Sequence, residues 1–178
     1  MEALEQNYRS ALIGATIQDV TFFIAGENFL VFDPDHTWVL DIGMEMVLDK
    51  TTISFAVNLE MQLWDLIQDK IEALTGALDI FELEEEELPA KASLVGQKIK
   101  DVSFNWNWYH KLDEDFVPVQ EKTYIPFEMK LHLENGSTLQ LATIIFKLEN
   151  DELSNPKFNS QGQLLVSLNK LIEIEDVD

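Results

Sequence analysis

Residue types that commonly carry chemistry in proteins are sparse in this chain, and their spacing is not typical of a catalytic or metal site. The three histidines, His36, His110 and His132, lie in unlike contexts, and cysteine is absent. The chain has no zinc-ligand spacing, serine nucleophile elbow or phosphate-binding glycine loop. We therefore expect no enzyme activity, no cofactor and no metal site.

One short stretch places carboxylates in a pattern with known chemistry. The residues from Asn28 to Thr37 form an apolar run followed by Asp33, Asp35 and Thr37. This pattern resembles the first motif of haloacid dehalogenase-type phosphatases, which implies a nucleophilic Asp33 and magnesium held by both aspartates. The chain lacks the alternating strands and helices of that fold, and Asp-Pro-Asp-His is also favourable turn chemistry. A loop is therefore the preferred interpretation.

The densest aromatic patch runs from Phe104 to His110. In a strand, Phe104, Trp106 and Trp108 would share one face, which predicts a core position for Trp106. A polar loop follows, so Trp108, Tyr109 and His110 fit a partner-binding surface as well as they fit a core. These three residues are the aromatic part of the predicted site.

Two runs of acidic residues accompany the aromatic patch. Acidic runs are usually solvated, and carboxylates so close in sequence would bind calcium weakly at best. As a rim around an interface, they would accelerate the approach of a cationic protein. The predicted partner-binding residues are therefore Trp108, Tyr109, His110, Asp113, Glu114, Asp115, Glu84, Glu85, Glu86 and Glu87.

The charge balance restricts the class of partner. The 178 residues include 33 acidic and 12 basic side chains, for a net charge of -21, and 46% of residues are hydrophobic. Such a chain can bury a core, and its surface repels nucleic acids and anionic membranes. No signal peptide or membrane-spanning run is apparent, so we expect a cytoplasmic protein.

Alternating apolar and polar residues predict two β-hairpins. In the run from Met129 to Leu141, Asn135-Gly136 separates the two strands and favours a type I′ turn. The run from Met44 to Phe55 repeats the pattern with a shorter turn. These hairpins predict mainly antiparallel sheets in an α+β fold.

The chain also shows signs of internal duplication. Residues 12–22 match residues 94–104, and Gly76–Ile80 weakly matches Gly162–Val166. With the two hairpins between them, these matches predict duplicated halves of about 85 residues each, 1–88 and 89–178, packed as one unit with pseudo-twofold symmetry. Each half would begin with a strand that bulges near Asp19 or Asp101.

The connecting segments of the two halves differ in pattern. Helical spacing of leucines predicts one helix, at about residues 59–75, in the first half. The corresponding residues 149–162 predict an irregular loop, and residues 171–175 alternate like a strand. Residues 81–90 predict a strand that gives way to a linker.

Size, acidity, the lack of cysteine and the β-rich pattern give the whole chain a character that resembles the immunity proteins of bacterial polymorphic toxins. The resemblance implies an inhibitor that covers the cleft of a basic toxin, with Trp108 or Tyr109 as a hot spot. It transfers no functional residue, because no diagnostic motif carries it. Alternatives are a small-ligand-binding module with a groove between the repeats and a structural protein. The chain would be a monomer or a homodimer.

Overall fold

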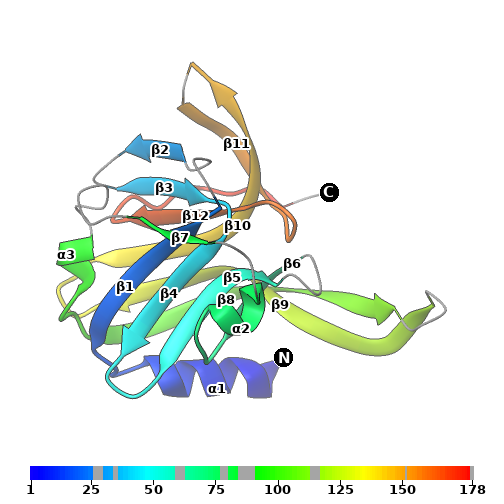
Figure 1. Cartoon of the computed structure of the whole chain (residues 1–178), viewed down its shortest axis with the longest axis horizontal. Helices are drawn as coiled ribbons and strands as arrows, with labels where there is room; N and C mark the ends of the chain where they lie inside the picture. Colours follow the sequence, from blue (N-terminus) through cyan, green and yellow to red (C-terminus); the bar gives the residue numbers. More distant parts are fainter. Residues whose placement is uncertain are drawn as a thin grey trace.

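The computed structural model describes residues 1–25, 30–33, 36–58, 63–76, 80–83, 91–112, 117–150 and 152–176, without the side chains of 33, 109, 111–112, 118–119 and 121. These residues form two mainly antiparallel sheets and three helices, so the fold is α+β and rich in β-structure (Figure 1). The helices are α1 (Glu2–Leu12), α2 (Glu72–Thr75) and α3 (Lys91–Leu94).

The first sheet has five strands in the order β6-β5-β4-β1-β7. Their bounds are β1 Ile17–Ile24, β4 Gly43–Leu48, β5 Thr52–Asn58, β6 Leu63–Ile67 and β7 Phe81–Glu82.

The second sheet has seven strands, ordered β2-β3-β12-β10-β9-β8, with β11 also paired to β10. Their bounds are β2 Leu30–Asp33, β3 Thr37–Leu40, β8 Ile99–Leu112, β9 Pro118–Leu133, β10 Thr138–Glu149, β11 Glu152–Phe158 and β12 Gln163–Leu168.

The main core lies between the two sheets. It includes Phe22, Phe55 and Trp64 from the five-stranded sheet, together with Trp38 and Leu141 from the seven-stranded sheet. Two smaller apolar clusters lie on the faces of the sheets that point away from the main core. One is around Phe23 and Ile71 beside α2, and the other is around Ile144 and Phe158. Burial on both faces explains why several strands are almost entirely apolar.

The two predicted hairpins are confirmed as β4–β5 and β9–β10. The predicted type I′ turn is wrong. It requires positive φ at both Asn135 and Gly136, and only Gly136 has it, at 90°. Leu133 N donates to Ser137 O at 2.9 Å, so three residues form the loop rather than two. The additional residue allows Asn135 to keep a negative φ while Gly136 adopts the left-handed conformation.

The helix predicted at 59–75 is also wrong. Residues 63–67 are strand β6, and only Glu72–Thr75 is helical, while 59–62 lie outside the described residues. Trp64 and Leu66 are buried with a period of two because β6 pairs with β5. Sheet pairing overrides the helical spacing of the leucines.

The prediction of one helix in the first half missed α1, which precedes β1. Leu4, Tyr8 and Leu12 repeat at a spacing of four residues, and Tyr8 and Leu12 are buried. Glu2 and Glu5 in the first turn and Arg9 in the last turn suit the helix dipole. These signals were present in the sequence. In Figure 1, α1 lies across the lower end of the two sheets.

The loop predicted at residues 149–162 is wrong, because this segment contains strand β11. The strand predicted at residues 171–175 is also wrong, since only a single bridge from Glu175 to Lys157 forms there. On the β12 side of β10, Thr138 O accepts a hydrogen bond from Asn169 N. Thr143 O lies five residues farther along β10 and accepts a hydrogen bond from Asn159 N. Because carbonyls alternate between the edges of a strand, Asn159 and β11 lie on the β9 side. β11 therefore replaces β9 along β10 after Ala142.

The loop after β11 must cross β10 to reach β12 on the other edge. Gly162 lies so close to β10 that an added Cβ would be 2.0 Å from Ile144 O. Trp64 of the other sheet holds this loop, since its backbone N donates to Ser160 O at 3.0 Å and its Nε1 donates to Gly162 O at 2.8 Å.

The strands β1 and β8 begin at a shared junction between the sheets. Gly14 N donates to Ile99 O and Gly96 N donates to Ile17 O, both at 2.8 Å, and the two glycines have φ of 82° and 81°. Ile17 N and Ile99 N return hydrogen bonds of 2.9 Å to Gln97 O and Ala15 O. The predicted bulges are confirmed as register shifts between Ile17 and Asp19 and between Ile99 and Asp101.

We predict that Gly162→Ala destabilises the fold by about 2–3 kcal/mol, because the new methyl group overlaps backbone atoms that cannot rotate away. Gly136→Ala is the control, since nothing lies within 4 Å of its added Cβ and only the positive φ opposes it. That cost is about 1 kcal/mol. Urea unfolding measures both variants, and equal losses would contradict the close crossing.

Candidate partner-binding site

The predicted aromatic site residues lie on a two-stranded arm formed by β8 and β9. Trp108, Tyr109 and His110 pair with Tyr124, Thr123 and Lys122. The pairing of β9 with β10 ends at Glu128, so this part of β9 has only β8 as a neighbour in the sheet. The arm projects beyond the body of the molecule (Figure 1).

Burial decreases outward along one face of β8. Phe104 and Trp106 are half-buried against the main core, and their rings lie 6.1 and 6.2 Å from that of Tyr8 in α1. Trp106 Nε1 donates to Glu5 Oε2 at 2.9 Å. Trp106 is therefore at the margin of the core, whereas Trp108, two residues farther out, is 44% exposed.

Trp108 is held by neighbours on its own arm. Lys122 Nζ lies 3.6 Å from the centre of its ring, and the His110 ring meets it edge-on at a centroid distance of 5.2 Å. An exposed cation–π contact of this kind contributes about 0.5–1 kcal/mol. It orients the indole, and Lys122 shields part of the ring from a second cation.

The acidic part of the predicted site cannot be placed beside these rings. Asp113, Glu114, Asp115, Glu84, Glu85, Glu86 and Glu87 lie outside the described residues, as does the side chain of Tyr109. The sequence itself puts Asp113, Glu114 and Asp115 directly after the last residue of β8.

The phosphatase-like motif is only partly described. Asp35 and the side chain of Asp33 lie outside the described residues. Thr37 is buried, with its Oγ1 3.2 Å from Ser167 Oγ, and His36 Nδ1 lies 3.1 Å from Leu168 O. Both side chains thus attach β3 to β12, and the motif leads into an antiparallel pair of strands.

The other histidine contacts are also between strands, since His132 Nδ1 lies 3.2 Å from Thr138 Oγ1 across the β9–β10 hairpin. Within the described part of the chain, no three His, Asp or Glu side chains are grouped to hold a metal ion.

Helix α1 supports the base of the arm, and sequence reasoning missed its contribution. The Tyr8 hydroxyl donates to Leu66 O in β6, and burial raises the pKa of Tyr8 well above its ordinary value. Arg9 donates to Val102 O in β8 and pairs with Asp101 at 2.7 Å. The Val102 N–H and Arg9 lower the pKa of Asp101. The helical spacing of Leu4, Tyr8 and Leu12 was the available signal.

Cavities among the described residues include three that are not lined by Trp108, His110 or Lys122. One of about 400 Å³ lies between β2, β11 and the residues after β12, and one of about 330 Å³ lies on the β10–β11 hairpin. The third, of about 500 Å³, lies between α1 and β6. The first draws residues from both sequence halves, as the predicted ligand groove would.

Comparison of the chain with family models, curated proteins and solved structures finds no match. None of the described helices is long and apolar enough to cross a membrane.

The raised pKa of Tyr8 predicts an alkaline loss of stability. Its folded-state pKa lies above the unfolded value of about 10, so this contribution is complete below pH 10 and is lost as the pH rises further. The limiting slope is about 1.4 kcal/mol per pH unit. In Tyr8→Phe, the free energy of unfolding should fall less steeply above pH 10.

Tyr8→Phe should also lose about 1–3 kcal/mol at neutral pH, because the Leu66 carbonyl loses its buried partner. Ser54→Ala is the control, because it removes a hydroxyl that donates to Asp69 O at 2.7 Å and carries no titrating group, so it should keep the wild-type alkaline slope. Denaturant titrations from pH 7 to 12 make the comparison. Parallel curves for wild type and Tyr8→Phe would refute the assignment.

Proposed function

We propose that this protein is a non-enzymatic binding protein that inhibits a basic protein partner through the β8–β9 arm. The observation that carries the proposal is the exposed, oriented indole of Trp108 on a projecting arm of a chain with net charge -21. Trp is among the residues most often found at the energetic centre of protein interfaces.

Shape and charge support different parts of this role. A narrow two-stranded arm can enter a cleft, and Trp106 and Tyr8 anchor its base to the main core. The negative field attracts a basic protein over a long range and raises its association rate. Lys122 already contacts the Trp108 ring, so a partner that covers this face of the ring must displace Lys122.

The negative charge and the projecting arm together favour a more specific proposal, that the protein is an immunity protein that inhibits a toxin. A toxin that acts on nucleic acid needs a cationic cleft, and an acidic protein with a projecting arm is suited to occupy such a cleft. This form of the proposal also places the protein in the cytoplasm, where the toxin would act, as a monomer or a homodimer.

We predict that the immobilised protein captures a basic protein from its native host, and that Trp108→Ala weakens the complex at least tenfold, which is about 1.4 kcal/mol. Leu148→Ala is the control because Leu148 is 53% exposed on the other hairpin. Isothermal titration of the purified partner gives the dissociation constants. Increasing salt from low to moderate should slow association.

Two results would contradict this function. One is that no basic protein is retained at either salt concentration. The other is that Trp108→Ala and Leu148→Ala bind the purified partner equally, because the arm would then be outside the interface.

We further propose that the chain arose by duplication of a sheet-forming unit. In support, β1-β4-β5-β6 and β8-β9-β10-β11 follow the same neighbour order, and each unit begins with a helix and a glycine. Val20 N and Val102 N each donate to the carboxylate of the preceding aspartate at 2.8 Å. Asp19 of the first unit forms an ion pair with Lys91 of α3, the helix before the second unit. Asp101 of the second unit likewise pairs with Arg9 of α1, the helix before the first unit. The strands β2 and β3 have no counterpart among the described strands of the second unit.

The cavity lined from both halves supports a second candidate function, small-ligand binding. Its lining combines Phe32, Leu153 and Ile172 with Lys170 and Glu152, so it offers apolar surface and both charges. A ligand at 100 times its dissociation constant would stabilise the fold by about 2.7 kcal/mol.

We predict that a ligand found in a thermal-shift screen loses most of its effect in Leu153→Ala and keeps it in Leu148→Ala. Both variants remove one leucine from β10 or β11, and only Leu153 lines this cavity. An equal thermal shift in both variants would place the ligand elsewhere.

A further inference from the structure

The inward face of β10 changes character where the 159–162 loop crosses it. Leu139, Leu141 and Thr143 point into the fold and are buried, while Ile145, next on the same face, is 45% exposed. Gly162 and Trp64 hold the loop at the crossing, so the rest of β10 extends past the five-stranded sheet that contains Trp64. An apolar side chain is thereby left at the surface of a very acidic protein.

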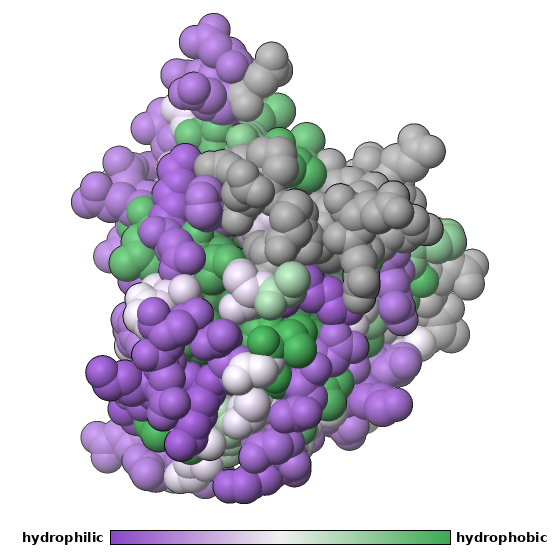
Figure 2. Space-filling view, turned by 90° about the vertical axis from the view of Figure 1, so that its left-hand side faces the viewer, coloured by the Kyte–Doolittle hydropathy of each residue, from purple (hydrophilic) through white to green (hydrophobic). Residues whose placement is uncertain are grey.

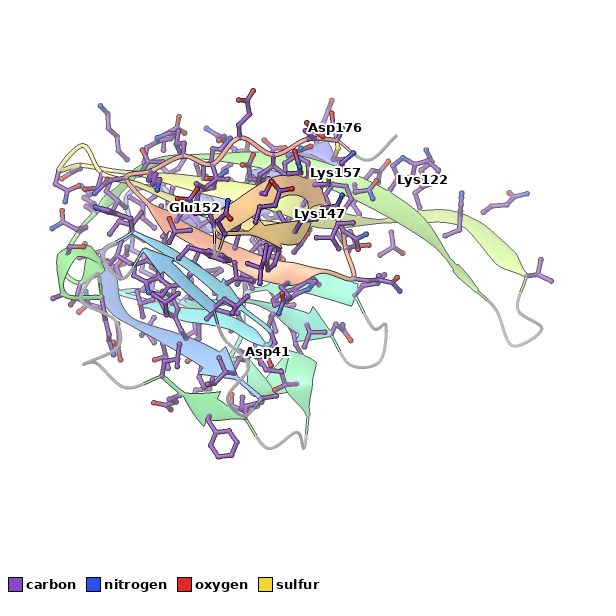
Figure 3. All side chains as sticks on the ribbon, turned by 90° about the horizontal axis from the view of Figure 1, so that it is seen from above. Asp41, Lys122, Lys147, Glu152, Lys157 and Asp176 are labelled. Carbon is purple, nitrogen blue, oxygen red and sulfur yellow. The ribbon has the colours of Figure 1, made fainter. Side chains whose placement is uncertain are left out.

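Two lysines flank Ile145. Lys157 is its direct partner in β11, and Lys147 lies two residues farther along β10 on the same face. Both line the cavity of about 330 Å³, together with Ile145, Phe146, Asn155 and Glu175. Figure 3 shows Lys147 and Lys157 close together, with Lys122 farther out along the other arm.

The lysines differ in their present partners. Lys157 Nζ lies 3.4 Å from Glu175 Oε2, with side chains 39% and 63% exposed. A pair this exposed contributes about 0–1 kcal/mol, so another anion can compete with Glu175 for the ammonium group. Lys147 has no ion pair within the described residues, although the chain has 33 acidic residues for 12 basic ones.

Glu175 is held in the cavity by its backbone. Phe158 N donates to Glu175 O, and Glu175 N donates to Pro156 O, both at 3.0 Å. The two ammonium groups and this one carboxylate sum to a charge of +1, since +2 and -1 are present. One negative charge therefore neutralises the cavity, whereas a dianion such as a phosphate would exceed it.

We propose that this cavity binds a monocarboxylate with an apolar body. The carboxylate lies between Lys147 and Lys157 and displaces Glu175 from Lys157, and the hydrocarbon covers Ile145. Charge-assisted hydrogen bonds to two ammonium groups fix one end of the ligand. Burial of exposed apolar surface stabilises the other end. This site is separate from the β8–β9 arm, and it does not depend on the partner proposed above.

Octanoate is the probe, titrated into the full chain and followed by the methyl NMR signals of Ile145. Saturable shifts of these signals are expected, and Lys147→Gln should weaken binding at least fivefold. Glu175→Gln should strengthen binding severalfold, because it removes the competing carboxylate and keeps the backbone contacts. Lys50→Gln, in the β4–β5 turn, should leave binding unchanged.

The sign of the Glu175→Gln effect separates this site from a merely structural contact, whose loss would weaken binding. Octylammonium is the control ligand and should bind more weakly than octanoate. The proposal is overturned if octylammonium binds as tightly, if Glu175→Gln weakens binding, or if octanoate leaves the Ile145 signals unchanged. Thermal unfolding of each variant verifies that the fold is intact.

Discussion

Backbone hydrogen bonds between residues 14–17 and 96–99 join the two sheets, and the rest of the fold is built out from this junction. Gly14 and Gly96 turn the chain there with nearly equal positive φ, and each N–H is satisfied by a carbonyl of the other segment. Ala15, Ile17 and Ile99 are buried, so their backbone groups must stay paired, and the two strands cannot separate without losing several hydrogen bonds together. The inward faces of β1 and β8 are thus directed into one core.

Helix α1 closes the end of the core that this junction leaves open. Leu12 and Tyr8 fill the space between the sheets, and Arg9 reaches Val102 of β8. Figure 2 shows a different face of the molecule, where hydrophilic side chains predominate among the coloured atoms and green apolar groups lie between them. The chain thus combines a net charge of -21 with an apolar interior shared by the two sheets.

The change of partner along β10 creates both proposed binding surfaces. Where β9 leaves β10 and β11 takes its place, Phe127 and Phe158 stack at a centroid distance of 5.6 Å. Two hairpins then extend past the sandwich in different directions (Figure 1). Trp108 is exposed on one, and Ile145 is exposed between two lysines on the other. Strands that continue beyond their sheet necessarily expose side chains that the sequence pattern assigns to a core.

Local patterns predicted much of the antiparallel structure, and they failed where contacts with distant segments determine the conformation. The hairpins, the bulges near Asp19 and Asp101 and the strand after Gly162 depend on neighbouring residues or on turn chemistry. The predicted helix at 59–75 failed because Trp64 pairs with β5 and donates to the carbonyl of Gly162, which is 98 positions away in the sequence. Helical spacing describes only near neighbours along the chain, so it could not reveal this contact.

By itself, the sequence determined the net charge, the apolar alternation of the strands and the turn residues, because these are properties of single residues and near neighbours. Only the tertiary structure decided that Trp106 lies at the core margin and Trp108 at the surface, although both occupy the same face of one strand. Their difference depends on the contacts that Glu5 and Tyr8 of α1 make with Trp106, and on where β9 leaves β10. These contacts join segments remote in sequence, and a local pattern carries no information about them.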